Sequence, residues 1–199
     1  MKSGDNVADD GLGSQSARIL VVCTANLARS PLAQALLSHH LPFPGLLVTS
    51  AGTQAHAGLP AAEGAVELAA ARGLDLSTHR SQPVTHDLLR DSDLVLTMSE
   101  RQRDRCASKV ARGGSRTFTL REFIRLLDAA ELAGSPVTSI DRVRWIRDRA
   151  HRARPRAVRP KVPEDIADPI GRPPKAWRAL GEQIDAAVAR ITAAIEDGR

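Results

Sequence analysis

Hydrophobic residues in this chain form short uninterrupted runs that alternate with longer stretches of helical spacing. The short runs are rich in β-branched and other apolar residues, which predicts strands. They lie at 18–22, 46–50, 93–98 and 117–120. Elsewhere apolar residues recur every three or four positions, which predicts helices. These stretches lie at 31–41, 61–72, 85–89, 99–111, 120–132, 140–151 and 177–196.

This order of elements predicts an architecture. Strands that alternate with helices favour a parallel sheet with crossover connections. We therefore expect an α/β fold in which a four-stranded parallel sheet is flanked by helices on both faces. Ligands of such sheets bind at the carboxyl ends of the strands. The loops after residues 22, 50 and 98 should all lie at that edge.

A length of 199 residues suits one domain with a sizeable core. Residues 1–17 are rich in Gly, Ser, Asp and Asn, so we expect a disordered tail. The domain should then comprise 18–199, with a basic insertion at about 133–165. Prolines at the end of the insertion favour an extended linker. Its arginines leave two alternatives: a solvated excursion, or a surface that docks an acidic or phosphorylated protein.

Composition narrows the range of partners and compartments. The formal net charge is +5, which favours acidic or phosphorylated partners. Aromatic residues make up 3% of the chain and Tyr is absent, which disfavours nucleic-acid binding through interleaved aromatics. Two cysteines without a disulfide pattern, no signal-peptide pattern and no long apolar run predict a cytoplasmic protein without a membrane span.

The first predicted strand leads into the segment Val-Cys-Thr-Ala-Asn-Leu-Ala-Arg-Ser-Pro at 22–31. Pro31 suits the start of a helix, so Cys23 to Arg29 form a strand-to-helix loop. Such a loop directs backbone N–H groups at an anion. A thiol there favours the nucleophilic thiolate, and Arg29 can bind two oxygens of a tetrahedral anion. The segment predicts a phosphate-binding loop with a cysteine nucleophile.

The Cys-x5-Arg spacing occurs a second time, because Arg112 follows Cys106. The second copy lies in a polar, charge-rich helical stretch without a preceding strand, so we interpret it as a coincidence in an arginine-rich chain. For Cys23 the alternative to catalysis is a buried, inert thiol at a strand end. The apolar strand and the Ser-Pro helix start around it favour catalysis.

Further motifs accompany the cysteine loop in a fixed order. They are Ser-Ala-Gly-Thr at 50–53, Leu-Ser-Thr-His-Arg-Ser at 76–81, Asp-Leu-Val-Leu-Thr-Met at 93–98 and Asp-Pro at 168–169. With these residues the chain resembles the low-molecular-weight protein-tyrosine phosphatase family over about 19–127 and 168–195. The resemblance implies hydrolysis of phosphotyrosine through a cysteinyl-phosphate intermediate.

The resemblance also implies roles for individual residues. Cys23 is the expected nucleophile, Arg29 the clamp on the transition state and Asp168 the general acid that protonates the leaving phenolate. Ser50 and His79 are expected to support the loop together with Asn26. The expected substrate-binding residues are Thr24, Ala25, Asn26, Leu27, Ala28, Ser30, His56 and Ile170. Because Arg29 and the loop amides neutralise the phosphate charge, no metal and no other cofactor is expected.

Three positions depart from the family pattern. Ile170 and His56 stand where the family often has aromatic residues that enclose a phosphotyrosine ring, so aryl specificity stays open. Ala28 replaces a frequent second cysteine, so a protective disulfide with Cys23 is not expected.

Two other functions stay open beside the phosphatase. An arsenate reductase on the same fold typically has Gln in place of Pro31, and its thioredoxin-linked members have a resolving cysteine pair. A version coupled to a low-molecular-weight thiol would need only Cys23. A catalytically weak phosphate- or phosphoprotein-binding module would account for the missing aromatic walls. The resemblance implies a phosphotyrosine protein as partner, for example a tyrosine kinase of polysaccharide export, and the Ala- and Arg-rich composition is compatible with a bacterial source.

Overall fold

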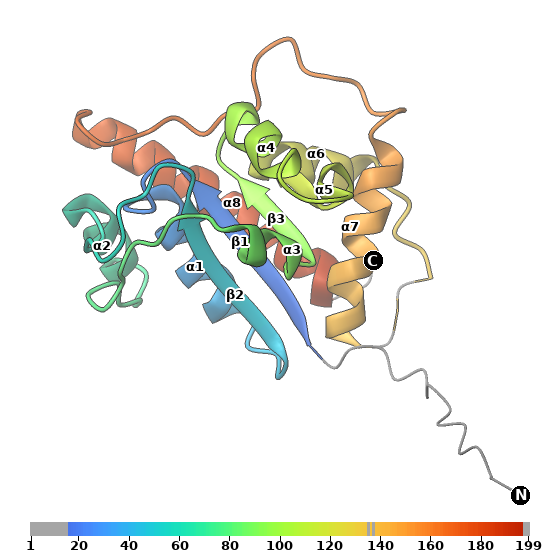
Figure 1. Cartoon of the computed structure of the whole chain (residues 1–199), viewed down its shortest axis with the longest axis horizontal. Coiled ribbons are helices and arrows are strands. Elements are labelled where there is room, and N and C mark those ends of the chain that lie inside the picture. Colours follow the sequence, from blue (N-terminus) through green and yellow to red (C-terminus); the bar gives the residue numbers. More distant parts are fainter. Residues whose placement is uncertain (1–15, 135, 137, 197–199) are drawn as a thin grey trace, which may run out of the picture.

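Four parallel strands form the centre of the molecule (Figure 1). The computed structural model describes residues 16–134, 136 and 138–196. The strands are β1 (Ala17–Cys23), β2 (Leu46–Gly52), β3 (Leu94–Thr97) and β4 (Thr117–Thr119), in the order β2-β1-β3-β4. The predicted four-stranded parallel sheet is confirmed. Residues 1–15 of the predicted tail lie outside the described residues, and its boundary is too late because Ala17 already belongs to β1.

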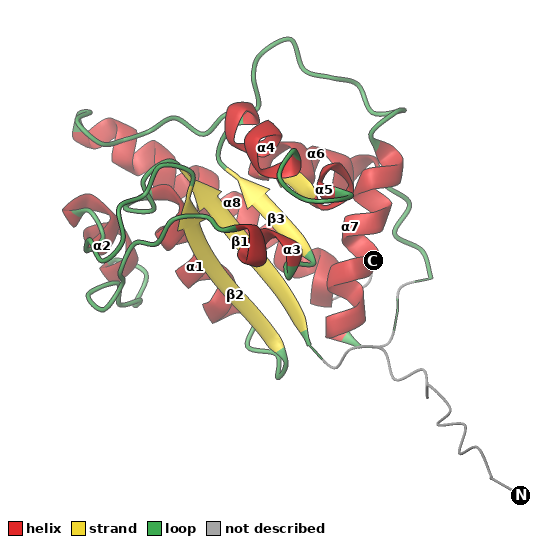
Figure 2. Ribbon diagram, in the orientation of Figure 1, coloured by secondary structure: helices red, strands yellow, loops and turns green. Residues whose placement is uncertain are grey.

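Helices cover both faces of the sheet, as predicted (Figure 2). Alternate residues of β1 face opposite sides: Ile19 and Val21 belong to one apolar cluster, Leu20 and Val22 to the other. The first cluster is completed by α1 (Arg29–His40), α2 (Glu63–Ala70), α6 (Leu120–Ala129), α7 (Ser139–Ala153) and α8 (Pro174–Glu196). The second is completed by α3 (His86–Arg90) and α4 (Glu100–Ala107).

The predicted helix at 99–111 is shorter in the structure, because α4 ends at Ala107. Arg112 has a φ of 56°, and a residue with this left-handed backbone conformation cannot belong to a right-handed helix, so the helical path is interrupted there. The two glycines that follow Arg112 begin the short helix α5 (Gly113–Arg116). A Cβ at Gly113 would lie 2.2 Å from the carbonyl oxygen of Ala107, so this glycine permits a close backbone approach.

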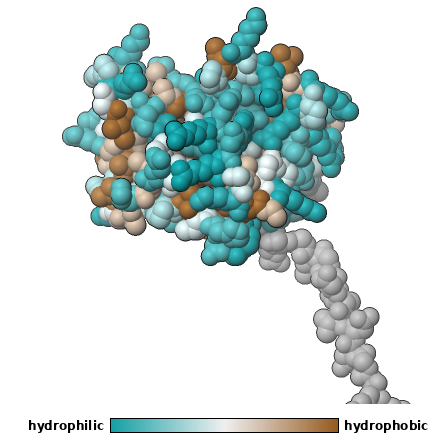
Figure 3. Space-filling view, turned by 45° about the horizontal axis from the view of Figure 1, so that its top comes forward, coloured by the Kyte–Doolittle hydropathy of each residue, from teal (hydrophilic) through white to brown (hydrophobic). Residues whose placement is uncertain are grey.

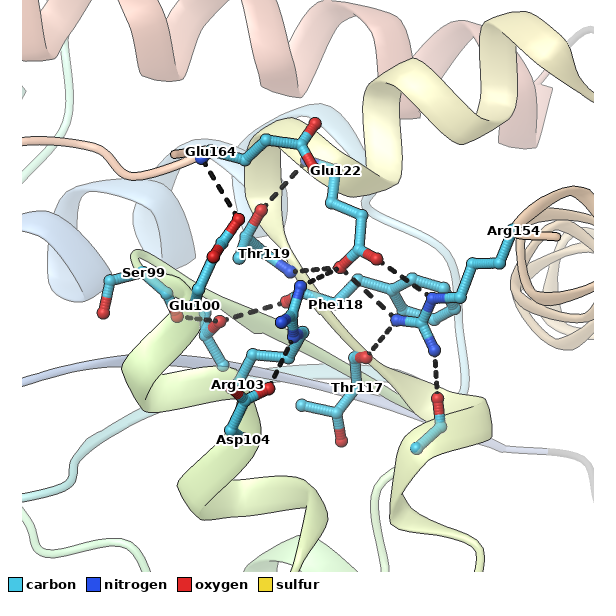
Figure 4. Close-up of polar contacts among 12 residues, drawn as sticks. Ser99, Glu100, Arg103, Asp104, Thr117, Phe118, Thr119, Glu122, Arg154 and Glu164 are labelled. Atoms are coloured by element: carbon cyan, nitrogen blue, oxygen red, sulfur yellow. Dashed lines mark hydrogen bonds and ion pairs between the residues drawn. The ribbon is translucent and has the colours of Figure 1, made fainter. Parts of the chain in front are cut away.

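The basic insertion contributes to the core through α7, whose Val143 and Ile146 are buried. Arginines of the insertion also form hydrogen bonds and ion pairs with the rest of the domain. Arg154 Nε donates to Glu122 Oε1 at 3.0 Å, and Arg103 Nη1 donates to Glu122 Oε2 at 3.3 Å, so one buried carboxylate of α6 lies between two guanidinium groups (Figure 4). Because removal of one member of a buried charge cluster leaves the others uncompensated, this contact fixes α7 against α6.

The face of the molecule shown in Figure 3 is largely hydrophilic, and its hydrophobic patches are small and separate. The large apolar side chains that are exposed in the described chain are Leu47, Leu59, Val158, Val162 and Ile170. None of the helices that the structure describes combines the length and the apolar content needed to cross a bilayer.

Candidate active site

The loop between β1 and α1 lies at the carboxyl edge of the sheet, where Cys23 pairs with Gly52 of β2. A Cβ at Gly52 would lie 2.5 Å from the carbonyl oxygen of Thr24 and 2.9 Å from the backbone nitrogen of Asn26. Only glycine therefore allows β2 to pass so close to the loop. The backbone N–H of Thr53 then donates to the carbonyl of Cys23 at 2.9 Å, which ties the two strand ends together.

Asn26 organises the loop from within. Its φ is 59°, a left-handed conformation that asparagine tolerates better than most residues. Its side-chain Nδ2 donates to Ser50 Oγ at 2.8 Å and to Ser30 Oγ at 3.0 Å. Its carbonyl accepts from His79 Nε2 at 2.8 Å. Ser50 and His79, the two other residues expected to support the loop, thus both contact the buried Asn26.

Two hydrogen-bond donors point at the sulfur of Cys23. The backbone N–H of Asn26 donates to Sγ at 3.2 Å, and the hydroxyl of Ser30 donates to Sγ at 3.0 Å. The helix that follows begins at Arg29, two residues earlier than the sequence suggested, and no side chain caps it. Uncapped N–H groups and the helix dipole favour negative charge at this end. Two hydrogen-bond donors thus converge on the sulfur at a helix end that favours an anion.

Arg29 extends from the first turn of α1 into the same site and is 6% exposed. Its Nη1 donates to the carbonyl of Ile166 at 3.1 Å, and its Nη2 forms an ion pair with Asp168. Its Nε is buried and has no hydrogen-bond partner in the part of the chain that the structure describes. A buried donor without a partner is unfavourable by about 1–3 kcal/mol, so an anion oxygen at this position would be stabilising.

The segment that carries Asp168 is held to the domain by two residues that precede Asp168 in the chain, Ile166 and Glu164. The backbone N–H of Ile166 donates to the carbonyl of Met98 at 2.8 Å, directly beyond β3. Glu164 forms a two-pronged ion pair with Arg125 of α6, at 2.7 and 2.8 Å (Glu164 is labelled in Figure 4). The Asp168 side chain itself is 45% exposed. The anchored backbone thus brings a solvent-accessible carboxylate to Arg29.

Most of the residues expected at the rim of the site are more exposed than Cys23 and Arg29. The side chain of Ile170 is 47% exposed, and its backbone N–H donates to Asp168 Oδ1 at 3.3 Å. His56 is exposed, and its carbonyl accepts from Ser81 Oγ at 2.5 Å. Ala28 is buried, whereas the three other loop residues of the predicted set are partly exposed: Thr24, Ala25 and Leu27. The structure thus links Ile170 to Asp168 and His56 to Ser81, and the roles of the rim residues stay expectations.

Two glutamines at the site have no signal in the sequence. The backbone N–H of Gln82 donates to Asn26 Oδ1, and its side chain donates to the carbonyl of Ser50, both at 2.9 Å. Gln102 Nε2 donates to Thr24 Oγ1 at 3.0 Å. A lone glutamine in a loop or on a helix matches no motif, so three-dimensional proximity alone reveals these contacts. Across the described residues, no group of three His, Cys, Asp or Glu side chains could hold a metal ion.

A comparison with family profiles matches residues 18–153 to "Low molecular weight phosphotyrosine protein phosphatase". The probable low molecular weight protein-tyrosine-phosphatase EpsP of Ralstonia nicotianae is 47% identical over 91 residues, 46% of this chain and 61% of that protein. The protein-arginine-phosphatase of Geobacillus stearothermophilus is 28% identical over 174 residues, 87% of this chain and 93% of that protein. The match spans about three fifths of the EpsP relatives, at 61% and 57% of their lengths.

Solved structures share the fold over most of their length. The YwlE arginine phosphatase from Geobacillus stearothermophilus superposes with a TM-score of 0.66 at 26% identity, covering 91% of this chain and 94% of that one. The tyrosine phosphatase amsI of Erwinia amylovora gives a TM-score of 0.65 at 26% identity, covering 93% of this chain and 97% of that one. Asp168 lies beyond the segment that the family profile matches, so its role as the general acid stays an expectation, and the structure adds its ion pair with Arg29.

Proposed function

Because the chain belongs to the low molecular weight phosphotyrosine protein phosphatase family, we propose that it hydrolyses protein phosphotyrosine through a cysteinyl-phosphate intermediate. One observation carries the proposal: two donors, from Asn26 and Ser30, converge on Cys23 Sγ at an uncapped helix start. Beside them, the buried Nε of Arg29 has no partner in the described chain. These features suit a thiolate that attacks an anionic group.

In the first step, loop amides and Arg29 bind the phosphate oxygens. The Cys23 thiolate then attacks phosphorus in line with the tyrosyl oxygen, so that an S–P bond forms while the P–O bond breaks. The electron pair of the broken bond passes to the phenolic oxygen, and Asp168 donates a proton to it. For this the phosphate replaces the Asp168 carboxylate on Arg29, which leaves Asp168 free to reach the leaving group.

In the second step, water hydrolyses the cysteinyl-phosphate. Asp168, now ionised, accepts a proton from the attacking water, since the group that acted as acid must act as base in the reverse sense. The S–P bond breaks, its electron pair returns to sulfur, and inorganic phosphate leaves. The hydroxyl of Ser30, 3.0 Å from Sγ, stabilises the thiolate that is regenerated.

The proposed substrate is a phosphotyrosine protein in the cytoplasm, and a tyrosine kinase of polysaccharide export is the specific candidate that the family resemblance suggests. The measurement is direct: the purified phosphatase should remove phosphotyrosine from the cytoplasmic domain of such a kinase. Retention of the phosphotyrosine with active phosphatase present would exclude this partner and leave the enzymatic proposal intact.

Protein-arginine phosphatase activity is a second candidate, because a relative aligned over 93% of its own length carries that name. The two leaving groups differ in what they need around them. A guanidinium group favours carboxylates, whereas an aryl ring packs on apolar side chains. Leu27 and Ile170 are the apolar residues expected at the rim, while Asp168 is the carboxylate at Arg29. This composition favours phosphotyrosine.

The test compares hydrolysis of a phosphotyrosine peptide and a phosphoarginine peptide by the wild type, Cys23→Ser and Asp168→Asn. We expect preference for phosphotyrosine, loss of turnover in the first variant and a drop of about 10²–10⁴-fold in the second. Preference for phosphoarginine would assign the second function. Reduction of arsenate without phosphatase activity would favour the reductase, although Cys106, the other thiol of the chain, is buried on the opposite face of the sheet.

A further inference from the structure

A cleft lined by residues with polar side chains adjoins the Cys23 loop on the side of α4. One wall comes from the loop itself and from the residues after β2, namely Thr24, Thr53 and Gln54. The other wall comes from the start of α4 and one face of it, namely Ser99, Arg101 and Arg105. The reaction at Cys23 does not explain why these residues line the cleft.

Hydrogen bonds hold the cleft against the catalytic loop. The backbone N–H of Gln54 donates to the carbonyl of Thr24 at 2.8 Å. From the opposite wall, Gln102 Nε2 donates to Thr24 Oγ1 at 3.0 Å. Because Thr24 directly follows Cys23 in the chain, a group bound in the cleft would lie next to a phosphate at Cys23.

Arg101 and Arg105 lie one helical turn apart and are both exposed. No described carboxylate lies within ion-pair distance of either guanidinium. Their neighbour Arg103 is different: its Nε donates to Asp104 Oδ1 at 2.9 Å, and its Nη1 donates to Glu122 (Figure 4). The two arginines that line the cleft thus carry positive charge that the described protein does not neutralise locally.

The remaining lining adds donors. Thr24 Oγ1 accepts a hydrogen bond from Gln102, so its own proton is available to donate. Ser99 Oγ accepts from the backbone N–H of Gln102 at 3.3 Å and is in the same situation. No Asp or Glu side chain lines the cleft in the described structure. Two guanidinium groups, three hydroxyls and two side-chain amides make a lining that is complementary to an anion.

We propose that this cleft binds a second anionic group of the substrate, a carboxylate or a phosphate on a residue near the phosphotyrosine. The inference rests on the proposed function, because the phosphotyrosine must occupy the Cys23 loop for its neighbour to reach Arg101 and Arg105. The cleft then selects acidic or multiply phosphorylated segments. The contribution to affinity comes from two solvent-accessible ion pairs, so it is modest and sensitive to salt.

The test uses three phosphotyrosine peptides of otherwise identical sequence, with glutamine, glutamate or phosphoserine two residues to either side. For each enzyme, kcat/KM on the charged peptides is divided by kcat/KM on the glutamine peptide. We expect a ratio of about five- to tenfold in the wild type at low salt, close to one in Arg101→Gln/Arg105→Gln. The glutamate and phosphoserine arms separate the two sources of negative charge.

The matched control is Arg152→Gln/Arg156→Gln, which removes two arginines from the insertion at a groove beside Glu131. This variant should keep the wild-type ratio. A wild-type ratio near one, a ratio that persists without Arg101 and Arg105, or a ratio lost in the control instead would each overturn the proposal. Hydrolysis of the glutamine peptide by the wild type tests the phosphatase function independently of the cleft.

A binding measurement tests the proposal even if the wild-type enzyme is inactive. Anisotropy of labelled peptides is measured with Cys23→Ser and with Cys23→Ser/Arg101→Gln/Arg105→Gln. The proposal requires tighter binding of the charged peptides by the first protein and equal binding by the second. Equal binding of all peptides by the first protein would overturn it, whether or not the wild type is a phosphatase.

Discussion

Cys23 and Cys106 each precede an arginine by six residues, and both thiols are almost fully buried, with 2% and 0% of their surface exposed. Their surroundings differ. Two hydrogen-bond donors point at Cys23 Sγ, whereas Cys106 packs among apolar residues such as Leu89 and Val95. Burial raises the pKa of Cys106 to about 11. Reactivity therefore depends on the polar groups around a thiol rather than on its spacing from an arginine or on its exposure.

The two arginines differ in the same way. Arg29 is buried in the first turn of α1, and its Nε has no partner in the described chain. Arg112 is exposed in a left-handed conformation between α4 and α5. Of the two copies, the first alone has a strand before the cysteine and a helix that starts at the arginine. A strand end and a helix start provide the anion-binding backbone that spacing alone does not provide.

The largest expected difference between the two copies concerns turnover. Cys23→Ser should lower kcat by about 10⁴-fold or more, because a hydroxyl is a much poorer nucleophile than a thiolate. Cys106→Ala should keep kcat within about twofold, since it leaves the loop untouched, and should lower stability by about 0.5–3 kcal/mol. Steady-state hydrolysis of an aryl phosphate measures the first effect, and urea denaturation measures the second. Equal losses of turnover would contradict the assignment.

Arg29 of the first copy also forms an ion pair with Asp168, whereas Arg112 of the second copy has no ion pair with a described carboxylate. Asp168→Asn should lower kcat by about 10²–10⁴-fold on substrates with a basic leaving group, and less on activated aryl esters that leave without a proton. Asp165→Asn is the matched control, because that carboxylate lies on the same segment and accepts from the backbone N–H of Glu100 at 2.9 Å. The same loss for every leaving group would show that Asp168 has a structural role instead.

At alkaline pH the buried Cys106 thiol should make the stability of the protein depend on pH. The pKa of Cys106 is raised from 9.0 to about 11, so the folded state retains its proton where the unfolded state loses it. The contribution of the Cys106 proton to the free energy of unfolding is therefore fully present below pH 9, and about 2–3 kcal/mol is lost as the pH rises toward 11. Cys106→Ala should remove this part of the loss. Urea denaturation at several pH values measures it, and parallel curves for both proteins would refute the attribution.

Each copy contains one non-glycine residue with positive φ, and glycine should have opposite effects at the two positions. Asn26→Gly keeps the backbone relaxed but removes the bonds to Ser30, Ser50 and Gln82, so stability should fall by about 2 kcal/mol. Arg112→Gly relieves a left-handed conformation and should gain about 0.5–1 kcal/mol. Thermal unfolding of both variants decides, and effects of the same sign would contradict the comparison.

The sequence predicted the elements that simple periodicity controls. The strands, the helices on both faces and the loop from Cys23 to Arg29 follow from apolar spacing and from a Ser-Pro helix start. The network around Asn26 was expected from the family resemblance, and the structure places Ser50 and His79 there.

Other features depend on distance in space and left no local signal. Gly52 permits a backbone approach between segments far apart in the sequence, and the contacts of Gln102 cross from α4 to the loop. The arginines of the insertion suggested an exposed surface, yet Arg154 binds Glu122 inside the domain. Charge along a sequence does not show which arginines find buried partners, because those partners come from other elements.

We expect Cys23, and not Cys106, to carry the phosphoryl group during turnover. The measurement mixes the enzyme with an aryl phosphate, quenches with acid within milliseconds and maps the phosphorylated peptide by mass spectrometry. The expected result is a gain of one phosphoryl group on the peptide that contains Cys23, and none in Cys23→Ser. A phosphoryl group on another residue, or rapid turnover by Cys23→Ser, would show that Cys23 is not the nucleophile.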